Sequence, residues 1–478
     1  MNLGTSLHWI SKKMSDKIAI IENGNEVSYS DLWSNIELLA KAFLKKGIRQ
    51  DDRIVLVLPN GKEFIYSFYA LSRINAISVP LNPSLTPYEL IDIFDDCSPK
   101  AVITTLGIYK KSISHIDNAN RMIILVNGSG DADQNKCQFQ FEELLEIAKS
   151  ENEKLPNINT NNNHVATINY TYRGLGKPLG AMLTHGNYHH GAIGYVRLTE
   201  VATSQRVILI TPISHIFTLV SCVIVPLLRG ATVVIIKSFI PRHVFKIIQE
   251  YKIDFMIAVP TIYISLLRNY KKNPFDISSL KYGITGGSYL SLNVQREIKN
   301  VMGIELLQGY GLTETMPIAC NPRSKNKPES LGVPGHEVKV KIVDGEIVIG
   351  GPTVMREYYN KNGENRKFFK NGWFYTGDAG WIDKEGYIYF KGLRKDIVKV
   401  GGHNVDLKEV KNVLSSFRGV TDVQLKAVED DLWGHVINAE IEIASKKEIT
   451  EKAIRSFCKK RLAIYKIPKN IFITKGKA

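Results

Sequence analysis

The chain has 478 residues, of which 44% are hydrophobic and 23% are charged. This balance is typical of globular proteins, and it excludes a mostly disordered, collagen-like or disulfide-scaffold protein. The five cysteines are scattered and none forms a CxxC pair. That pattern excludes a thiolate zinc site and favours a reducing compartment. Because the N-terminal residues lack the basic-then-apolar order of a signal peptide, we expect a cytoplasmic protein.

The net charge of +15 is concentrated near the C-terminus, where residues 446–478 hold eleven Lys and Arg and only two Glu. Such a segment suits an acidic carrier protein, coenzyme phosphates or nucleic acid, and a solvated basic face is an equally good interpretation. No nucleic-acid-binding module accompanies the charge, so we expect no nucleic-acid partner. Residues 207–228 carry no charge, but Pro212 and Pro226 interrupt them. They predict a buried strand, a loop and a helix, and no membrane span.

Short apolar runs alternate with amphipathic stretches along the first part of the chain. The spacing predicts helices over 30–46, 63–74 and 87–94, and strands over 53–58, 76–80, 101–104 and 122–126. This alternation predicts an α/β fold with mixed and parallel sheets flanked by helices.

The pattern of apolar runs and turn residues changes in the C-terminal part of the chain. After Gly345 the pattern becomes short strands and turns. A small α+β unit then follows, with helices predicted over 407–414 and 448–462 and strands over 420–426 and 436–443. We therefore expect a large N-terminal domain of residues 1–391, a hinge at 392–396 and a small C-terminal domain at 397–478.

A glycine-punctuated segment, residues 169–187, lies between an apolar strand and a candidate helix. Gly174, Gly176 and Gly180 allow close approach of a ligand to the backbone, whose successive N–H groups can bind an anion. The segment does not match the GxxxxGK[ST] phosphate loop, and a structural turn explains it about as well.

Two later motifs carry further candidates. In LLQGYGLTET, residues 306–315, the flanking glycines make Tyr310 accessible for stacking on a flat ring. Thr313 can bond a phosphate oxygen and Glu314 can hold a hard divalent cation, although a strand-end turn with a surface Glu is the simpler interpretation. WFYTGDAG predicts a tight turn in which Asp378 can accept both hydroxyls of a ribose, or merely forms the turn.

The order of the motifs is more specific than any one of them. YT..GxGxP, TPISHIF, ITGG, GYGLTE, YTGD and KD…KVGG..V resemble the adenylate-forming superfamily of acyl- and aryl-CoA synthetases, luciferases and peptide-synthetase adenylation domains. The resemblance runs from about Val27 to Tyr465. It implies that ATP and Mg²⁺ activate a carboxylic acid as an acyl adenylate, which then forms a thioester with coenzyme A or a carrier-protein phosphopantetheine. It also implies that the small C-terminal domain is mobile and rotates between the two half-reactions.

By position, the resemblance gives each motif a role. The loop from Thr171 to Gly180 would surround the β- and γ-phosphates, Thr313 would meet the α-phosphate, and Glu314 would hold the magnesium ion. The residues assigned to the nucleotide and the coenzyme are Thr171, Arg173, Gly174, Gly176, Lys177, Gly286, Gly287, Ser288, Gly309, Tyr310, Gly311, Asp378, Lys399, Gly401 and Gly402. The residues assigned to catalysis are His215, Thr313, the hinge residue Lys395, and Lys477.

The chain departs from the family pattern in the phosphate loop and at its end. Leu179 stands where the loop usually carries a Lys, and we expect Arg173, helped by Lys177, to take over the β/γ-phosphate contact. The chain ends at ITKGKA, several residues early relative to YKIP. Lys477 is therefore either a shortened substitute for the usual C-terminal lysine, or that lysine is absent.

The acid substrate is only partly defined by the sequence. The segment ISHIFTLVSCV offers no carboxylate to pair with a substrate ammonium, which favours a simple carboxylic acid. His215 and Phe217 are candidates to close the acid pocket, and an ordinary core histidine is the alternative. Two other functions fit the departures above: a degenerate adenylate-binding partner subunit, and an acyl transferase that retains only the thioester half-reaction.

Overall fold

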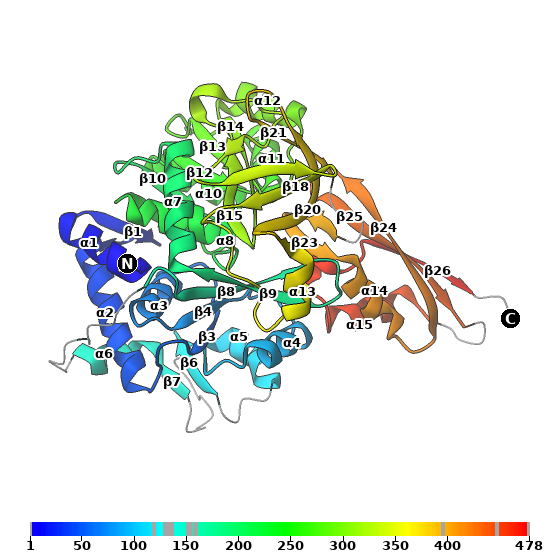
Figure 1. Ribbon diagram of the computed structural model, residues 1–478, viewed down its shortest axis with the longest axis horizontal. Coiled ribbons are helices and arrows are strands. Elements are labelled where there is room, and N and C mark those ends of the chain that lie inside the picture. The colour runs from blue at the N-terminus through cyan, green and yellow to red at the C-terminus, as the bar shows by residue number, and fades with distance from the viewer. Residues whose placement is uncertain are drawn as a thin grey trace.

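The computed structural model describes residues 2–116, 121–127, 138–149, 155, 161–392, 397–444 and 449–475. Within them, three sheets precede residue 393 and a fourth lies beyond residue 396. Figure 1 shows the fourth sheet at one end of the molecule, beside a larger N-terminal body. The predicted mixed α/β fold is confirmed.

The first large sheet has seven strands, and all its neighbouring pairs except β8–β9 are parallel. Its spatial order is β7 (Gln138–Gln140), β6 (Met122–Val126), β5 (Ala101–Thr105), β3 (Arg53–Val57), β4 (Ile77–Pro80), β8 (Val165–Tyr172) and β9 (Pro178–Thr184). The helices of this part are α2 (Tyr29–Lys45), α3 (Lys62–Arg73), α4 (Pro87–Cys97), α5 (Leu106–Lys111), η1 (Ile113–His115) and α6 (Phe141–Lys149).

The second large sheet has nine strands with a parallel centre. Its order is β16 (Val333–Pro334), β15 (Thr315–Cys320), β14 (Glu305–Leu312), β13 (Tyr282–Thr285), β12 (Phe255–Ala258), β10 (Arg206–Leu209), β11 (Thr232–Ile235), β1 (Ile18–Glu22) and β2 (Asn25–Ser28). Its helices are α1 (Leu3–Lys13), α7 (His185–Thr199), α8 (Ile216–Thr218), the π-helix η2 (Leu219–Ile224), α9 (Val225–Leu228), α10 (Pro241–Tyr251), α11 (Pro260–Tyr270), α12 (Leu292–Met302) and the short η3 (Arg323–Lys325).

One apolar core joins the two large sheets. It contains Ile54 and Leu56 of the first sheet together with Val207 and Leu209 of the second. Alternate residues of each parallel strand face the opposite side of the sheet, where helices cover them. The uncharged stretch 207–228 forms a strand, a loop and a short helical run, as predicted, and most of its residues are buried. No helix in the described part of the chain is long and apolar enough to cross a membrane.

The two remaining sheets have five strands each. The third comprises β17 (Lys339–Val343), β18 (Glu346–Gly350), β19 (Phe369–Lys370), β20 (Trp373–Ile382) and β21 (Ile388–Gly392), with α13 (Asn362–Phe368) beside it. The fourth comprises β22 (Ile397–Val400), β23 (His403–Asp406), β24 (Val420–Asp430), β25 (Gly434–Ile443) and β26 (Asn470–Lys475), with α14 (Leu407–Ser415), α15 (Glu451–Lys459) and η4 (Ile464–Lys466).

Local capping explains where two helices begin. Thr86 and Glu89 form a reciprocal capping box at the start of α4, with Pro87 in its first turn. The predicted helix over 448–462 is shorter in the structure. It begins after Thr450, whose side chain accepts the N–H of Ala453 and fixes the N-terminus.

Candidate functional site

A cavity of about 730 Å³ lies between the two large sheets and the β22–β23 hairpin. Its walls come from segments that directly follow β3, β4, β10, β11, β12 and β13, and from the ends of β8 and β14. These are the carboxyl ends of parallel strands, where α/β folds bind their ligands. The C-terminal sheet closes this cavity, an arrangement that we call docked.

Ten of the predicted site residues line the cavity. They are Thr171, His215, Gly286, Gly287, Gly309, Gly311, Thr313, Lys399, Gly401 and Gly402. Eight others lie outside its lining: Arg173, Gly174, Gly176, Lys177, Ser288, Tyr310, Glu314 and Asp378. Lys395 and Lys477 fall outside the described residues.

Tyr310 and Asp378 form a buried pair. The tyrosine is 7% exposed, and its hydroxyl donates to Asp378 Oδ2 at 2.5 Å. The expectation of an accessible Tyr310 ring is therefore not met in this arrangement. The predicted tight turn at Asp378 is not formed, because this residue lies within strand β20. The pairing of β20 with β18 is irregular at this point, where Gly377 adopts φ +76°. The strand continues beyond the irregularity.

Burial governs the ionisation of this region. It raises the pKa of Asp378, although the charge of Lys399 acts in the opposite direction. Burial also lowers the pKa of Lys399, which the Asp378 charge partly offsets. Burial thus favours the neutral form of each group, and the attraction between their charges favours the ionised forms.

Arg173 is turned toward Glu314. Its Nε lies 3.5 Å from Glu314 Oε1, and the two side chains are 9% and 1% exposed. Its Nη2 donates to the carbonyl oxygens of Thr376 at 2.6 Å and Tyr375 at 3.2 Å. The same Glu314 oxygen accepts the hydroxyl of Tyr358 at 2.5 Å. In the docked arrangement the guanidinium is thus the buried counter-ion of Glu314, and it does not face the cavity.

Two rings complete the surroundings of this guanidinium. Its carbon lies 4.9 Å from the centroid of Phe368 and 5.4 Å from that of Phe374. A planar guanidinium packs well against aromatic faces, which a lysine ammonium does less well. The site therefore suits an arginine specifically.

The rest of the glycine-rich segment is held by other contacts. Lys177 pairs with Glu364 at 3.1 Å and is half exposed. Gly174 and Gly176 have φ values of +74° and +72°, the left-handed conformation that favours glycine. The N–H of Gly176 donates to Asp406 Oδ2 at 2.8 Å, and Asp406 belongs to the C-terminal sheet. This contact joins segments 230 residues apart and was not predictable from local patterns.

Three aromatic side chains in contact connect the N-terminal body to the C-terminal sheet at the cavity. His215 and His403 lie 4.8 Å apart edge-to-face, and His403 stacks on Tyr465 at 4.0 Å. Burial lowers the pKa of His215 to about 4 and that of His403 to about 3. Asn82 Nδ2 lies 3.4 Å from His215 Nε2. Sequence reasoning missed His403, and its only signal was its position directly after the KVGG motif.

The residues present do not offer an open magnesium site in the docked arrangement. In the described ranges no three His, Cys, Asp or Glu side chains are grouped in a way that could hold a metal ion. Glu314 has the right chemistry for Mg²⁺, but it is 1% exposed and its Oε1 is already engaged.

Comparison with known proteins adds family information. The model of the AMP-binding enzyme family matches residues 7–359. The chain is 28% identical to a long-chain-fatty-acid–CoA ligase of Bacillus subtilis, over 96% of this chain and 88% of that protein. It is 27% identical to the 2-succinylbenzoate–CoA ligase of the same organism, over 98% and 93%.

Two solved structures of o-succinylbenzoate CoA synthetase from Bacillus subtilis, both 26% identical, are similar to different degrees. A double mutant bound with its product analogue matches with a TM-score of 0.84, covering 98% of this chain and 94% of that one. The complex with the acyl-adenylate intermediate matches with a TM-score of 0.70 over the same shares.

Proposed function

The chain belongs to the AMP-binding enzyme family as an acid–thiol ligase of the adenylate-forming superfamily, and we propose that its docked arrangement is the one that forms the thioester. The enzyme activates a carboxylic acid with ATP as an acyl adenylate, releasing pyrophosphate, and then forms the coenzyme A thioester. In this second step the thiol loses its proton to solvent, its sulfur bonds the acyl carbon, the bond from that carbon to the phosphate oxygen breaks, and AMP leaves.

One observation carries the proposal. The β22–β23 hairpin brings Lys399, Gly401 and Gly402 into the same cavity as Gly287 and Thr313. A Cβ on Gly402 would lie 2.7 Å from Val259, so only a glycine allows the hairpin to approach so closely. The higher similarity to the product-analogue complex than to the acyl-adenylate complex supports the same assignment.

We assign the lining residues to parts of the substrates. Gly286 and Gly287 face the nucleotide, Thr313 contacts the α-phosphate, and Gly401 with Gly402 lines the path of the pantetheine arm. The assignment has physical support, because backbone N–H groups and a hydroxyl at strand ends can bind phosphate oxygens without a covalent role. Gly309 and Gly311 keep the adjacent wall free of side chains.

Further residues bind the nucleotide in the other arrangement of the C-terminal domain. We propose that Asp378 binds the ribose and Tyr310 the adenine once their mutual hydrogen bond opens, with Ser288 beside them. We also propose that the loop holding Thr171, Gly174, Gly176 and Lys177 contacts the β- and γ-phosphates then. Glu314 is the proposed contact to a nucleotide-bound Mg²⁺.

The movement itself is proposed from the chain's organisation. Residues 392–396, including Lys395, would form the hinge between domains 1–391 and 397–478. Lys477 would bridge the substrate carboxylate and the α-phosphate when adenylate forms.

The acid substrate is proposed to be a simple carboxylic acid without an amino group. The described residues that line the cavity include no Asp, Glu or Arg. Apolar walls come from Phe217, Leu312 and Met316, and Phe217 packs directly against Gly286. Lys111, Lys237 and Lys399 also line the cavity, and Glu22 pairs with Lys237 at 3.1 Å. An acid with an amino group would lack a partner for its charge here.

Coenzyme A is the acceptor to test first, and a carrier-protein phosphopantetheine is a second proposed acceptor, supported by the basic C-terminal segment. A cytoplasmic location is also proposed, in keeping with four buried free cysteines in the described part of the chain.

The experiment is carboxylate-dependent exchange of labelled pyrophosphate into ATP, followed by thioester formation with coenzyme A. We expect both activities with aliphatic or aromatic monocarboxylic acids and neither with amino acids. Thioester formation from synthetic acyl adenylate without any exchange would support the acyl-transferase alternative. Absence of both would support the degenerate partner subunit.

A further inference from the structure

A buried ion cluster joins the C-terminal domain to the N-terminal body outside the cavity. The ammonium of Lys466 lies 2.7 Å from Glu89 Oε1 and 2.8 Å from Glu409 Oε1. Glu89 belongs to α4 and Glu409 to α14, so the two carboxylates come from opposite sides of the domain junction. Lys466 also lies 4.2 Å from the ring centroid of Tyr172, at the end of β8.

The cluster is sealed from water. Lys466 and Glu89 are each 1% exposed, and Glu409 is 11% exposed. A buried ammonium needs paired carboxylates, because removing its hydration is costly. Glu409 lies in the same domain as Lys466 and can follow it when that domain moves, whereas Glu89 cannot. The Lys466–Glu89 pair therefore exists only in the docked arrangement.

A second contact lies on the same helix end. Asp406 accepts the N–H groups of Lys408 and Glu409 through Oδ1 as the N-cap of α14, and its Oδ2 accepts the Gly176 N–H. Side chains of α14 also approach Gly176 closely, since a Cβ there would lie 3.1 Å from Asn412 Nδ2. The first turn of α14 is thus fixed against the N-terminal body by two independent contacts.

This helix end is continuous with the cavity wall. Strand β23 runs directly into α14, and β23 forms the hairpin that presents Gly401 and Gly402 to the cavity. We propose that Lys466 is a positioning residue for thioester formation: by joining Glu89 to Glu409 it holds α14, and through it the hairpin, against the N-terminal body. Lys466 does not line the cavity and touches no reacting atom. The inference rests on the proposed thioester-forming role of the docked arrangement.

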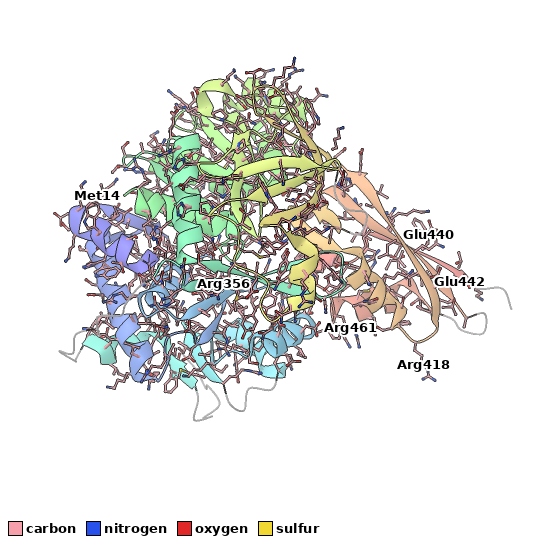
Figure 2. All side chains as sticks on the ribbon, in the orientation of Figure 1. Met14, Arg356, Arg418, Glu440, Glu442 and Arg461 are labelled. Carbon is pink, nitrogen blue, oxygen red and sulfur yellow. The ribbon has the colours of Figure 1, made fainter. Side chains whose placement is uncertain are left out.

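The decisive variant is Glu89→Gln, which alters the pair and keeps the helix cap. Glu89 Oε2 accepts the N–H of Thr86 at 2.9 Å, and a glutamine carbonyl oxygen can do the same. The glutamine amide then faces the Lys466 ammonium, so that attraction is lost. Glu440→Gln is the matched control. Glu440 pairs with Lys426 at 2.7 Å within the C-terminal sheet, and Figure 2 shows it far from the domain junction.

The two half-reactions are measured separately. Pyrophosphate exchange reports adenylation, and rapid mixing of coenzyme A with synthetic acyl adenylate of an accepted acid reports thioester formation. We expect Glu89→Gln to slow thioester formation by about tenfold or more and to leave exchange within about twofold of wild type, as one lost buried charge contact implies. Glu440→Gln should change neither rate.

A merely structural role predicts a different result. If Glu89→Gln lowered both half-reactions to the same extent, or lowered neither in an enzyme that catalyses both, the positioning role would be overturned. Lys466→Met should reproduce the selective loss and provides a second variant on the other side of the junction. A wild-type enzyme without thioester formation would instead overturn the proposed function itself.

Discussion

Replacing Arg173 with methionine tests whether this residue serves Glu314 or the phosphates of ATP. The guanidinium and the carboxylate are 3.5 Å apart, and both side chains are less than a tenth exposed. Two unit charges at 3.5 Å attract by about 5 kcal/mol at an effective dielectric constant of about 20. Removing one partner of a buried pair leaves the other charge unpaired and costs about 3–5 kcal/mol. The carbonyls of Tyr375 and Thr376 also lose their donor.

We therefore expect Arg173→Met to lower the free energy of unfolding by about 4 kcal/mol, measured by urea titration with tryptophan fluorescence. Glu314→Gln should also destabilise the protein, since it leaves the guanidinium without its counter-ion. The double variant should lose about 2 kcal/mol less than the sum of the two single losses. Lys177→Met is the control from the same loop, and its half-exposed pair with Glu364 predicts a loss below about 1 kcal/mol.

A different outcome would refute this reasoning. If Arg173→Met left the unfolding free energy within about 0.5 kcal/mol of wild type, the buried pair would contribute nothing to stability. If the same variant bound ATP more weakly and AMP normally, the guanidinium would be assigned to the β- and γ-phosphates, as its place in the glycine-rich segment first suggested. Calorimetric titration with the two nucleotides separates these results.

Three further predictions concern the nucleotide, the pH and the C-terminus. Asp378→Ala should raise the KM for ATP without changing the preference among acids, and a changed acid preference at normal KM would contradict the ribose assignment. The pKa values of His215 and His403, about 4 and about 3 when docked, lie below the ordinary value of about 6.5. Protonation of either histidine therefore opposes docking. Thioester formation should be fastest above about pH 6.5 and slow down as the pH falls toward 5. The variant His403→Gln should weaken this pH dependence. Lys477→Ala should reduce pyrophosphate exchange and spare thioester formation from acyl adenylate; unchanged exchange would show that another group serves.

Local sequence patterns predicted the elements well where local physics determines them. The helix that begins at Pro87 carries its own capping box, and the strand at Arg53–Val57 is apolar on both faces. The positions of the candidate ligands followed from the same logic. Gly286 and Thr313 lie directly after strands, and parallel strands bring their carboxyl ends to one edge of a sheet.

Features that depend on distant partners were not predictable in this way. WFYTGDAG reads as a turn, yet pairing with β18 on one side and β21 on the other keeps it extended. Tyr310 looks accessible between two glycines, but its hydroxyl bonds Asp378, 68 residues away. Lys466 belongs to a segment that reads as a solvated basic face, and it is nevertheless buried because Glu89 lies opposite it.

The register of the β8–β9 hairpin relates two positions at which the chain departs from the expected phosphate loop, Leu179 and Arg173. Leu179, where the family resemblance leads us to expect a lysine, pairs opposite Thr171 in β8–β9 and is fully buried. Arg173 follows the last residue of β8, one step beyond the Tyr172–Pro178 pair, and its long side chain reaches Glu314. A cation is thus absent from one strand and present beside the other, at the same end of the hairpin. Because a buried carboxylate requires a partner, Glu314 depends on the guanidinium that this end of the hairpin supplies, whereas Leu179 packs in the apolar interior and needs no counter-ion.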